Sequence, residues 1–123
     1  MSKLKGSAPD GADCAVAPLA REPLTAEAAA HLVVKLKALS DPVRLRLLSV
    51  VASHAGGEAC VCDLSAGIEL TQPTISHHLK VLRTAGLLSS ERRGSWVYYR
   101  IIGDALQELS QLLDVGSLTA SRA

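Results

Sequence analysis

The sequence predicts a mainly α-helical domain with one β-hairpin, in the order α-α-α-α-β-β-α. Four successive segments carry helix start and stop signals, mostly with apolar residues at helical spacing. Two short segments, 87–91 and 96–102, then read as strands joined by the turn sequence Arg92-Arg93-Gly94-Ser95. A last helix is expected from about Asp104 to Leu113, and the third and fourth helices, about 59–66 and 71–86, are tightly linked. This order is that of a winged helix-turn-helix, in which the hairpin is the wing.

Length and composition indicate a single domain with an aliphatic core. The chain has 123 residues, with no Phe, one Trp and two Tyr, so the core must be built from Leu, Val and Ala. We place the domain at residues 24–114, between an N-terminal arm at 1–23, expected to be flexible and to carry Cys14, and a flexible tail at 115–123. No run of about 18 apolar residues and no secretory signal is evident, so we expect a cytoplasmic protein.

The first two helices have recognisable start signals. Thr25 is expected to cap the first helix through its side-chain oxygen. Asp41 is expected to cap the second, with Pro42 in its first turn, where a missing N–H costs nothing. The second helix should turn Arg44 and Arg46 outward. The first helix should present an apolar stripe at helical spacing, formed by Leu32, Val33, Leu36 and Leu39.

The fourth helix, which Thr71 is expected to cap, has the pattern of a DNA-reading helix. Such a helix lays its N-terminal residues on base edges in the major groove. Gln72 can pair with adenine and Thr74 can contact a thymine methyl group, whereas Lys80 and Arg83 are placed for phosphates. The predicted DNA-binding residues of this helix and of the hairpin tip are Gln72, Thr74, Ser76, His77, Lys80, Arg83, Arg92 and Arg93.

The distribution of charge supports a phosphate-binding face. Net charge is only +1, but residues 71–102 hold five basic residues against one acidic residue. An ordinary solvated face is the alternative interpretation of the same charges. Of His77 and His78, one is expected to pack or hydrogen-bond within the fold, and the pair is not expected to hold a metal, because adjacent helical residues diverge.

Cys60 and Cys62 lie one short loop before the predicted DNA-reading helix. They are expected to be reduced, because three cysteines without an export signal do not indicate a disulfide framework. Thiolates bind soft ions such as Zn(II), Cd(II), Pb(II) and As(III). On a regular helix the two side chains would point about 200° apart, so sharing one ion requires a distorted helix start. With Cys14 the chain offers three sulfurs, which suit a pyramidal As(III) shell, whereas a structural zinc site takes four ligands. Each cysteine could instead be a small buried hydrophobe.

Three longer stretches carry a resemblance to a known family. They are ALSDPVRLRLL at 38–48, CVCDL at 60–64 and QPTISHHLKVL at 72–82, continued by GLL at 86–88 and WVYYR at 96–100. Over about residues 25–113 the chain resembles the ArsR/SmtB family of arsenic- and metal-responsive repressors. The resemblance implies a homodimeric winged-helix repressor that leaves its operator when the ion binds. We expect the first and last helices to form the dimer.

Two departures from that family's motifs bear on the ion. The arsenic-responsive members with the fullest motif carry a third cysteine where this chain has Ser65, so Cys14 would have to replace it, as an arm cysteine does in cadmium- and lead-sensing relatives. The zinc-sensing members place carboxylate and histidine ligands on the last helix. This chain keeps Asp104 but has Leu106 at the histidine position, so a zinc site there is not expected.

These observations predict an As(III)-responsive repressor of a palindromic operator, with Cys14, Cys60 and Cys62 as ligands and no permanently bound cofactor. The same scaffold could instead sense Cd(II) or Pb(II). A thiol redox switch is a different class, disfavoured because Glu58 and Asp63 would raise the pKa of the thiols. An enzyme is not expected, since no nucleophile–base constellation and no Gly-rich phosphate loop are present. The operator, its target genes and the subunit that supplies Cys14 stay open.

Overall fold

The computed structural model describes residues 23–114, and the predictions for the arm, its Cys14 and the tail 115–123 lie outside them. The described part contains five α-helices, one 3₁₀ turn and three strands. The helices and the turn are α1 (Ala26–Leu39), α2 (Pro42–Ser53), η2 (Ala55–Gly57), α3 (Val61–Ser65), α4 (Gln72–Thr84) and α5 (Gly103–Leu112). Within the described range no helix is both long and apolar enough to cross a membrane.

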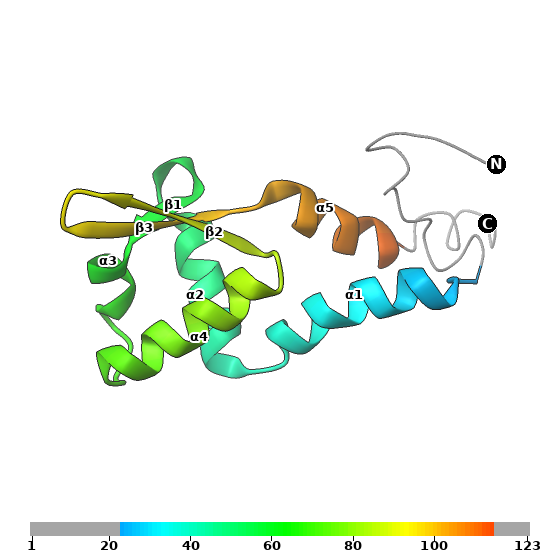
Figure 1. Cartoon of the computed structure of the whole chain (residues 1–123), viewed down its shortest axis with the longest axis horizontal. Helices are drawn as coiled ribbons and strands as arrows, with labels where there is room; N and C mark the ends of the chain where they lie inside the picture. The colour runs from blue at the N-terminus through cyan, green and yellow to red at the C-terminus, as the bar shows by residue number, and fades with distance from the viewer. Residues whose placement is uncertain (1–22, 115–123) are drawn as a thin grey trace, which may run out of the picture.

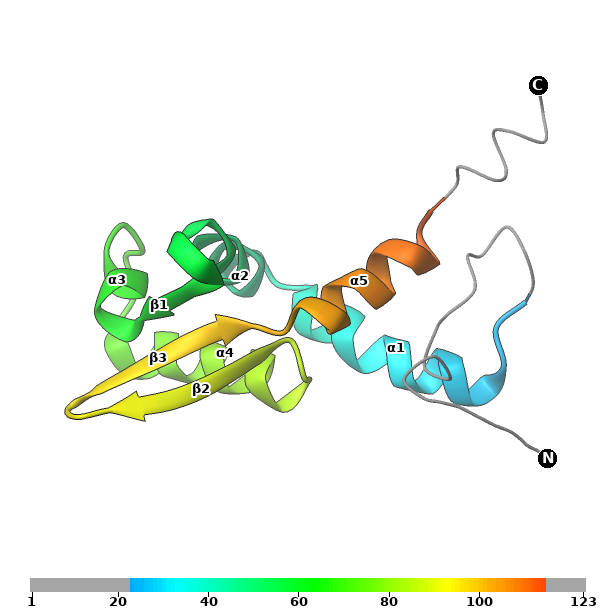
Figure 2. The same cartoon turned by 90° about the horizontal axis from the view of Figure 1, so that it is seen from above.

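The strands form one antiparallel sheet in the order β1-β3-β2. They are β1 (Glu58–Cys60), β2 (Leu88–Arg93) and β3 (Trp96–Ile101). The hairpin of β2 and β3 turns at Gly94, whose φ of 64° suits glycine, and projects as a wing beyond the helices (Figures 1 and 2). The winged helix-turn-helix is therefore confirmed.

Strand β1 was not predicted, because residues from about 59 were expected to be helical. In the structure Ala59 pairs with Tyr99 and Cys60 pairs with Tyr98, so the chain is extended up to Cys60 and only then becomes helical. Three residues carry too little alternation to indicate a strand on their own. Strand β1 forms by pairing with the edge of β3, which lies about forty residues further along the chain. The local sequence of residues 58–60 therefore gives no sign of this strand.

The predicted helix caps are present. Thr25 Oγ1 accepts a hydrogen bond from the backbone N–H of residue 28 at 3.1 Å, and Thr71 Oγ1 accepts one from Thr74 at 3.4 Å. Asp41 Oδ1 accepts from the N–H groups of residues 43 and 44 at 2.8 and 3.1 Å. These bonds, the one from residue 44 first, hold the pKa of the Asp41 carboxyl below its usual value. Local sequence is sufficient to predict such contacts, since donor and acceptor lie three residues apart or fewer.

The core is aliphatic, as the composition predicts, and it joins all five helices to the sheet. Its fully buried members include Leu32, Leu47, Val51, Leu64, Ile75, Leu79, Leu82, Leu87 and Leu88. The expected stripe on α1 is only partly confirmed. Leu32 is buried, but Val33 and Leu36 keep 42% and 37% of their surface exposed, and Lys35 and Ala38 face the domain in their place.

Helix α5 lies beside α1 at the end of the molecule opposite the wing (Figures 1 and 2). The two helices are joined by Glu108 of α5, whose Oε1 lies 2.9 Å from His31 Nε2 and 3.7 Å from Lys35 Nζ. Large apolar side chains remain exposed on both, namely Val33, Val34 and Leu36 of α1 and Leu113 at the end of α5. An apolar surface therefore remains uncovered on the two helices expected to form a dimer.

Candidate functional site

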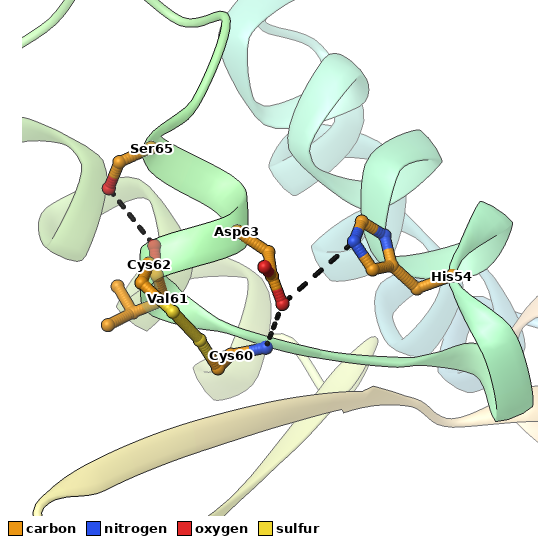
Figure 3. Close-up of a disulfide and its surroundings, with 6 residues drawn as sticks. All are labelled: His54, Cys60, Val61, Cys62, Asp63 and Ser65. Atoms are coloured by element: carbon orange, nitrogen blue, oxygen red, sulfur yellow. Dashed lines mark hydrogen bonds and ion pairs between the residues drawn. A yellow bond between two sulfur atoms is a disulfide. The ribbon is translucent and has the colours of Figure 1, made fainter.

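The two described cysteines meet at the corner where β1 becomes α3 (Figure 3). Cys60 ends β1 with an extended backbone, at φ −83° and ψ 160°, and Cys62 is the second residue of α3. Because Cys60 is not helical, the expected divergence of about 200° does not arise. The two sulfurs are bonded to each other as a disulfide, so the expectation of two free thiols is wrong for this structure.

The corner gives its two sulfurs different environments. Cys60, the last residue of β1, is only 5% exposed, whereas Cys62 is exposed at the start of α3. Ligand atoms of Cys60, Cys62 and Asp63 all lie within 4.8 Å of one another, so one ion could contact the three residues. Thiolates are the ligating form, so an ion can use both sulfurs only after the disulfide has been reduced.

Asp63 and His54 also belong to this site. The sequence indicates Asp63 only as a charge beside the thiols and gives no sign of His54. The Asp63 carboxylate accepts a hydrogen bond from the Cys60 backbone N–H at 3.4 Å, which ties the first turn of α3 to β1. His54 follows the end of α2, and its Nε2 lies 4.0 Å from Asp63 Oδ2 (Figure 3). The position of Asp63 directly after Cys62 in the sequence could have indicated that it belongs to the thiol site. His54 lies near the site only because the fold brings the end of α2 close to α3.

Ser65 stands where the fullest arsenic-responsive motif has a third cysteine, and its hydroxyl donates to the Val61 carbonyl at 3.0 Å. The part of the chain that the structure describes holds no third cysteine, since Cys14 lies outside it. A sulfur-only shell of three ligands therefore depends on a residue that is not described.

The predicted DNA-reading side chains on α4 are exposed. These are Gln72, Thr74, Ser76, His77, Lys80 and Arg83, and they lie off the buried stripe of Ile75, Leu79 and Leu82. The Thr74 hydroxyl lies 2.9 Å from the Thr71 hydroxyl, so its methyl group is the part left for a base contact. Hence α4 presents a polar and basic face along its whole length.

The expectation that one of the paired histidines bonds within the fold is confirmed for His78. Its Nδ1 lies 3.3 Å from Arg44 Nη1 and must accept, because a guanidinium can only donate. Arg44 also donates from Nε to the Ala38 carbonyl at 2.7 Å, so the expectation that it points outward is wrong. Arg44 instead links α1, α2 and α4, whereas His77 remains exposed.

A cavity of about 470 Å³ lies between α4 and α1. His77 and Lys80 line it from α4, Lys37 lines it from α1 and Arg44 from α2, above an apolar floor. Positive charge thus continues from the predicted DNA-reading face onto α1. Lys37 had not been predicted as part of that face, because it is separated from α4 by more than thirty residues in the sequence.

The two arginines at the wing have different surroundings. Arg93 donates from Nη1 and Nη2 to the Glu58 carboxylate at 3.0 and 2.6 Å, and from Nη2 and Nε to Glu91 at 2.8 and 3.2 Å. Its guanidinium carbon lies 4.5 Å from the centre of the Tyr98 ring. These hydrogen bonds raise the pKa of Arg93 and lower that of Glu58. Arg92 is exposed, and the described residues provide no ion pair for its side chain.

Comparisons with known proteins agree with this arrangement. The family model described as "Bacterial regulatory protein, arsR family" matches residues 41–90. The chain is 40% identical over 78 residues to the uncharacterized HTH-type transcriptional regulator MJ1325 of Methanocaldococcus jannaschii, which covers 63% of this chain and 85% of that protein. It is 42% identical over 80 residues to the arsenic resistance transcriptional regulator ArsR1 of Pseudomonas putida, covering 65% of this chain but only 61% of that protein.

Among solved structures, the AntR antimony-specific transcriptional repressor superposes with a TM-score of 0.61 at 30% identity, over 83% of this chain and 87% of that one. Fold, sequence and motif thus agree on one assignment. The chain belongs to the ArsR family of bacterial regulatory proteins, which are DNA-binding transcriptional repressors and not enzymes.

Proposed function

We propose that this protein represses transcription as a homodimer bound to a palindromic operator in the cytoplasm, and that it releases the operator when As(III) binds its cysteine thiolates. The observation that carries the proposal is the convergence of Cys60 and Cys62 at the corner that leads into the helix-turn-helix. Ions bound by these cysteines would thus act on the first helix of the unit that we propose to read DNA.

The choice of As(III) rests on the ligand set. Two sulfurs converge at the corner, and Cys14 could supply the third that a trigonal ion prefers. The similarity to a regulator named for arsenic resistance and to a repressor named for antimony supports a metalloid effector. Cd(II) and Pb(II) stay alternatives, because thiolates bind them as well.

The DNA contacts follow from the exposed face of α4 and from the wing. Gln72 and Thr74, in the first turn of α4, would read bases, while Ser76, His77, Lys80, Arg83 and Arg92 would contact the backbone. Arg93 can join them only by leaving the Glu58 carboxylate. Two-fold symmetry would place two such faces on successive major grooves, which suits a palindrome.

A dimer would cover the apolar surface on α1 and α5. Val33, Leu36 and Leu113 are each more than one-third exposed, and two copies related by a two-fold axis would bury them against each other. Sedimentation of the purified protein tests this step. Replacing Leu36 with Arg should shift the protein towards monomers, whereas an exposed polar position such as Gln107 should tolerate the same change.

The structure also suggests how an ion could act on DNA binding. Cys60 belongs to β1, which pairs with the wing strand β3, and Cys62 belongs to α3, which precedes α4. One ion bound to both sulfurs would fix the angle between the sheet and α3. No distortion of α3 is needed, in contrast to the expectation from the sequence, because Cys60 already lies outside the helix. The geometry of this corner is therefore the element that the ion would change.

The disulfide favours a second candidate function, a thiol-redox-responsive repressor. The same sulfurs would then be the switch, with oxidation to the disulfide in place of ion binding. In that case the oxidised and reduced proteins must differ in operator affinity without any ion.

One titration separates these candidates. DNA sites selected from a random pool by the reduced protein would be labelled, and release would be followed by fluorescence anisotropy as As(III), Cd(II), Pb(II) or a dithiol oxidant is added. The proposal expects release by As(III) at the lowest concentration. Release of the DNA by the oxidant alone, with no response to any ion, would identify a thiol-redox-responsive repressor and contradict the As(III)-responsive function.

A further inference from the structure

We infer that His54 is a fourth ligand that allows the Cys60–Cys62 site to hold a tetrahedral divalent ion, such as Cd(II) or Zn(II), in addition to a trigonal metalloid. The inference rests on the proposed function, in which this corner is the effector site. It adds a nitrogen donor from the residue that caps the C-terminal end of α2, a segment that contributes no sulfur.

The hydrogen bonds of His54 determine which ring nitrogen is available. Its Nδ1 lies 2.8 Å from the backbone carbonyl of Val50, and a carbonyl can only accept, so Nδ1 carries the proton. In the neutral ring Nε2 then has a free lone pair. A histidine that donates one ring N–H to a carbonyl and offers the other nitrogen is the common arrangement of a metal ligand.

The free nitrogen faces the thiol corner. His54 Nε2 is 4.0 Å from Asp63 Oδ2, and the Asp63 carboxylate shares the 4.8 Å cluster with both sulfurs (Figure 3). An ion at the cluster would draw Nε2 inward by a side-chain adjustment, because the His54 and Asp63 side chains keep 37% and 49% of their surface exposed. The same exposure gives the ion a route from solvent.

The donor set matches the chemistry of a divalent ion. Two thiolates, one carboxylate and one imidazole supply two sulfurs, one oxygen and one nitrogen, which is a complete tetrahedral shell for Zn(II) and acceptable for the softer Cd(II). As(III) instead favours three sulfurs and has no need of the imidazole. His54 should therefore contribute to divalent-ion affinity and leave As(III) affinity unchanged, which makes it a determinant of ion selectivity.

Loading the site requires prior reduction of the disulfide. A dithiol reductant supplies two electrons and two protons, becomes a cyclic disulfide, and leaves Cys60 and Cys62 as thiols. The divalent ion then displaces one proton from each thiol, so two protons are released for each ion bound.

The test compares His54→Asn with His31→Ala in the full-length, reduced protein. Asn keeps an N–H donor near the Val50 carbonyl but removes the second nitrogen, and His31 is a control because it bonds Glu108 far from the thiols. Affinities for Cd(II) and As(III) would be measured by competition with a chelator or dithiol of known affinity. Circular dichroism would confirm that both variants fold.

We expect His54→Asn to weaken Cd(II) binding by about 10- to 100-fold and to leave As(III) binding within about twofold of the wild type. ¹⁵N spectra of the wild type should show a large shift of Nε2 on adding Cd(II), and X-ray absorption should show nitrogen or oxygen beside sulfur. Unchanged Cd(II) affinity in the variant, an unshifted Nε2, or no Cd(II) binding to the reduced wild type would overturn the inference. If Cd(II) binds through Nε2 but no ion releases DNA, the proposed function fails and the assignment of His54 stands.

Discussion

Arg93 of β2 holds the Glu58 carboxylate of β1 with two hydrogen bonds, from Nη2 to Oε2 at 2.6 Å and from Nη1 to Oε1 at 3.0 Å. Glu58 also accepts from Arg100 at 3.3 Å, so both strands of the wing are attached to the short strand that ends in Cys60. A carboxylate that binds a guanidinium with both oxygens occupies the same donors that a phosphate would use. Arg93 of the wing is therefore already paired before DNA arrives.

This pairing predicts different roles for two adjacent arginines. Arg92→Ala should weaken binding to any DNA sequence and lower the salt slope by about one, because an unpaired cation contacts phosphate. Arg93→Ala should lower the slope by less, since its charge is compensated by Glu58. In the double variant Glu58→Gln/Glu91→Gln both partner charges of Arg93 are gone, and the later removal of Arg93 should then cost as much as the removal of Arg92. Equal effects of the two arginines in the wild-type background would contradict this prediction; the measurement is affinity against salt concentration.

The same pair predicts a pH dependence of stability. Hydrogen bonds from Arg93 hold the pKa of the folded Glu58 carboxyl below its ordinary value of 4.5. Because the pKa of this carboxyl is lower in the folded state than in the unfolded state, its ionised form stabilises the fold at pH values above the unfolded-state pKa. This stabilisation is lost as the pH falls through the lower pKa of the folded state. Urea unfolding at a fixed protein concentration should therefore show a larger loss of stability between neutral and acid pH in the wild type than in Glu58→Gln. Parallel losses in the two proteins would show that the pair contributes nothing.

Helix α3 is only five residues long, and its anchorage predicts a large effect of one core substitution. Leu64 is completely buried, and α3 is too short to be stable without packing. Leu64→Ala should lower the free energy of unfolding by about 2–5 kcal/mol. Leu70 lies 41% exposed after the same helix and is the matched control, for which a change within about 0.5 kcal/mol is expected. A small effect at Leu64 would mean that the helix is not held by this contact.

The exposed first turn of α4 predicts a base-reading role for Gln72. Its replacement by Ala should cost about 1–3 kcal/mol at one base-pair position and leave the preference at other positions unchanged. Competition among operator fragments that differ at single positions measures this effect. Lys80→Ala should instead weaken binding uniformly. An unchanged base preference in Gln72→Ala would show that α4 does not lie in the groove as proposed.

Sequence alone predicted the features that depend on neighbouring residues. The caps at Thr25, Asp41 and Thr71 join groups at most three residues apart, and the hairpin turn needs a glycine at a positive φ, which Gly94 supplies. These signals are local, so they need no knowledge of the rest of the fold. The order of the five helices and of the two hairpin strands followed from such local signals, whereas β1 did not.

The features that sequence missed depend on contacts between distant segments. Cys60 is extended because β1 pairs with β3. The side chains of Cys60 and Cys62 therefore do not diverge as they would on a regular helix, and both sulfurs can bind one ion. His54 reaches the thiol corner only because α2 packs beside it, and Arg44 turns inward to contacts on α1 and α4. Helical periodicity assigned Arg44 to the solvent, since periodicity describes one helix and not its neighbours.

The coupling between As(III) and operator DNA, measured in the reduced wild type and in the double variant Cys60→Ser/Cys62→Ser, tests whether the thiol corner controls DNA binding. Both proteins should bind the operator equally well. As(III) should weaken operator binding by the wild type about 5- to 150-fold, and the operator should weaken As(III) binding by the same factor, because coupling is reciprocal. The double variant should stay bound to the operator at every As(III) concentration. Release of the operator by As(III) from the double variant, to the same extent as from the wild type, would show that this corner is not the switch.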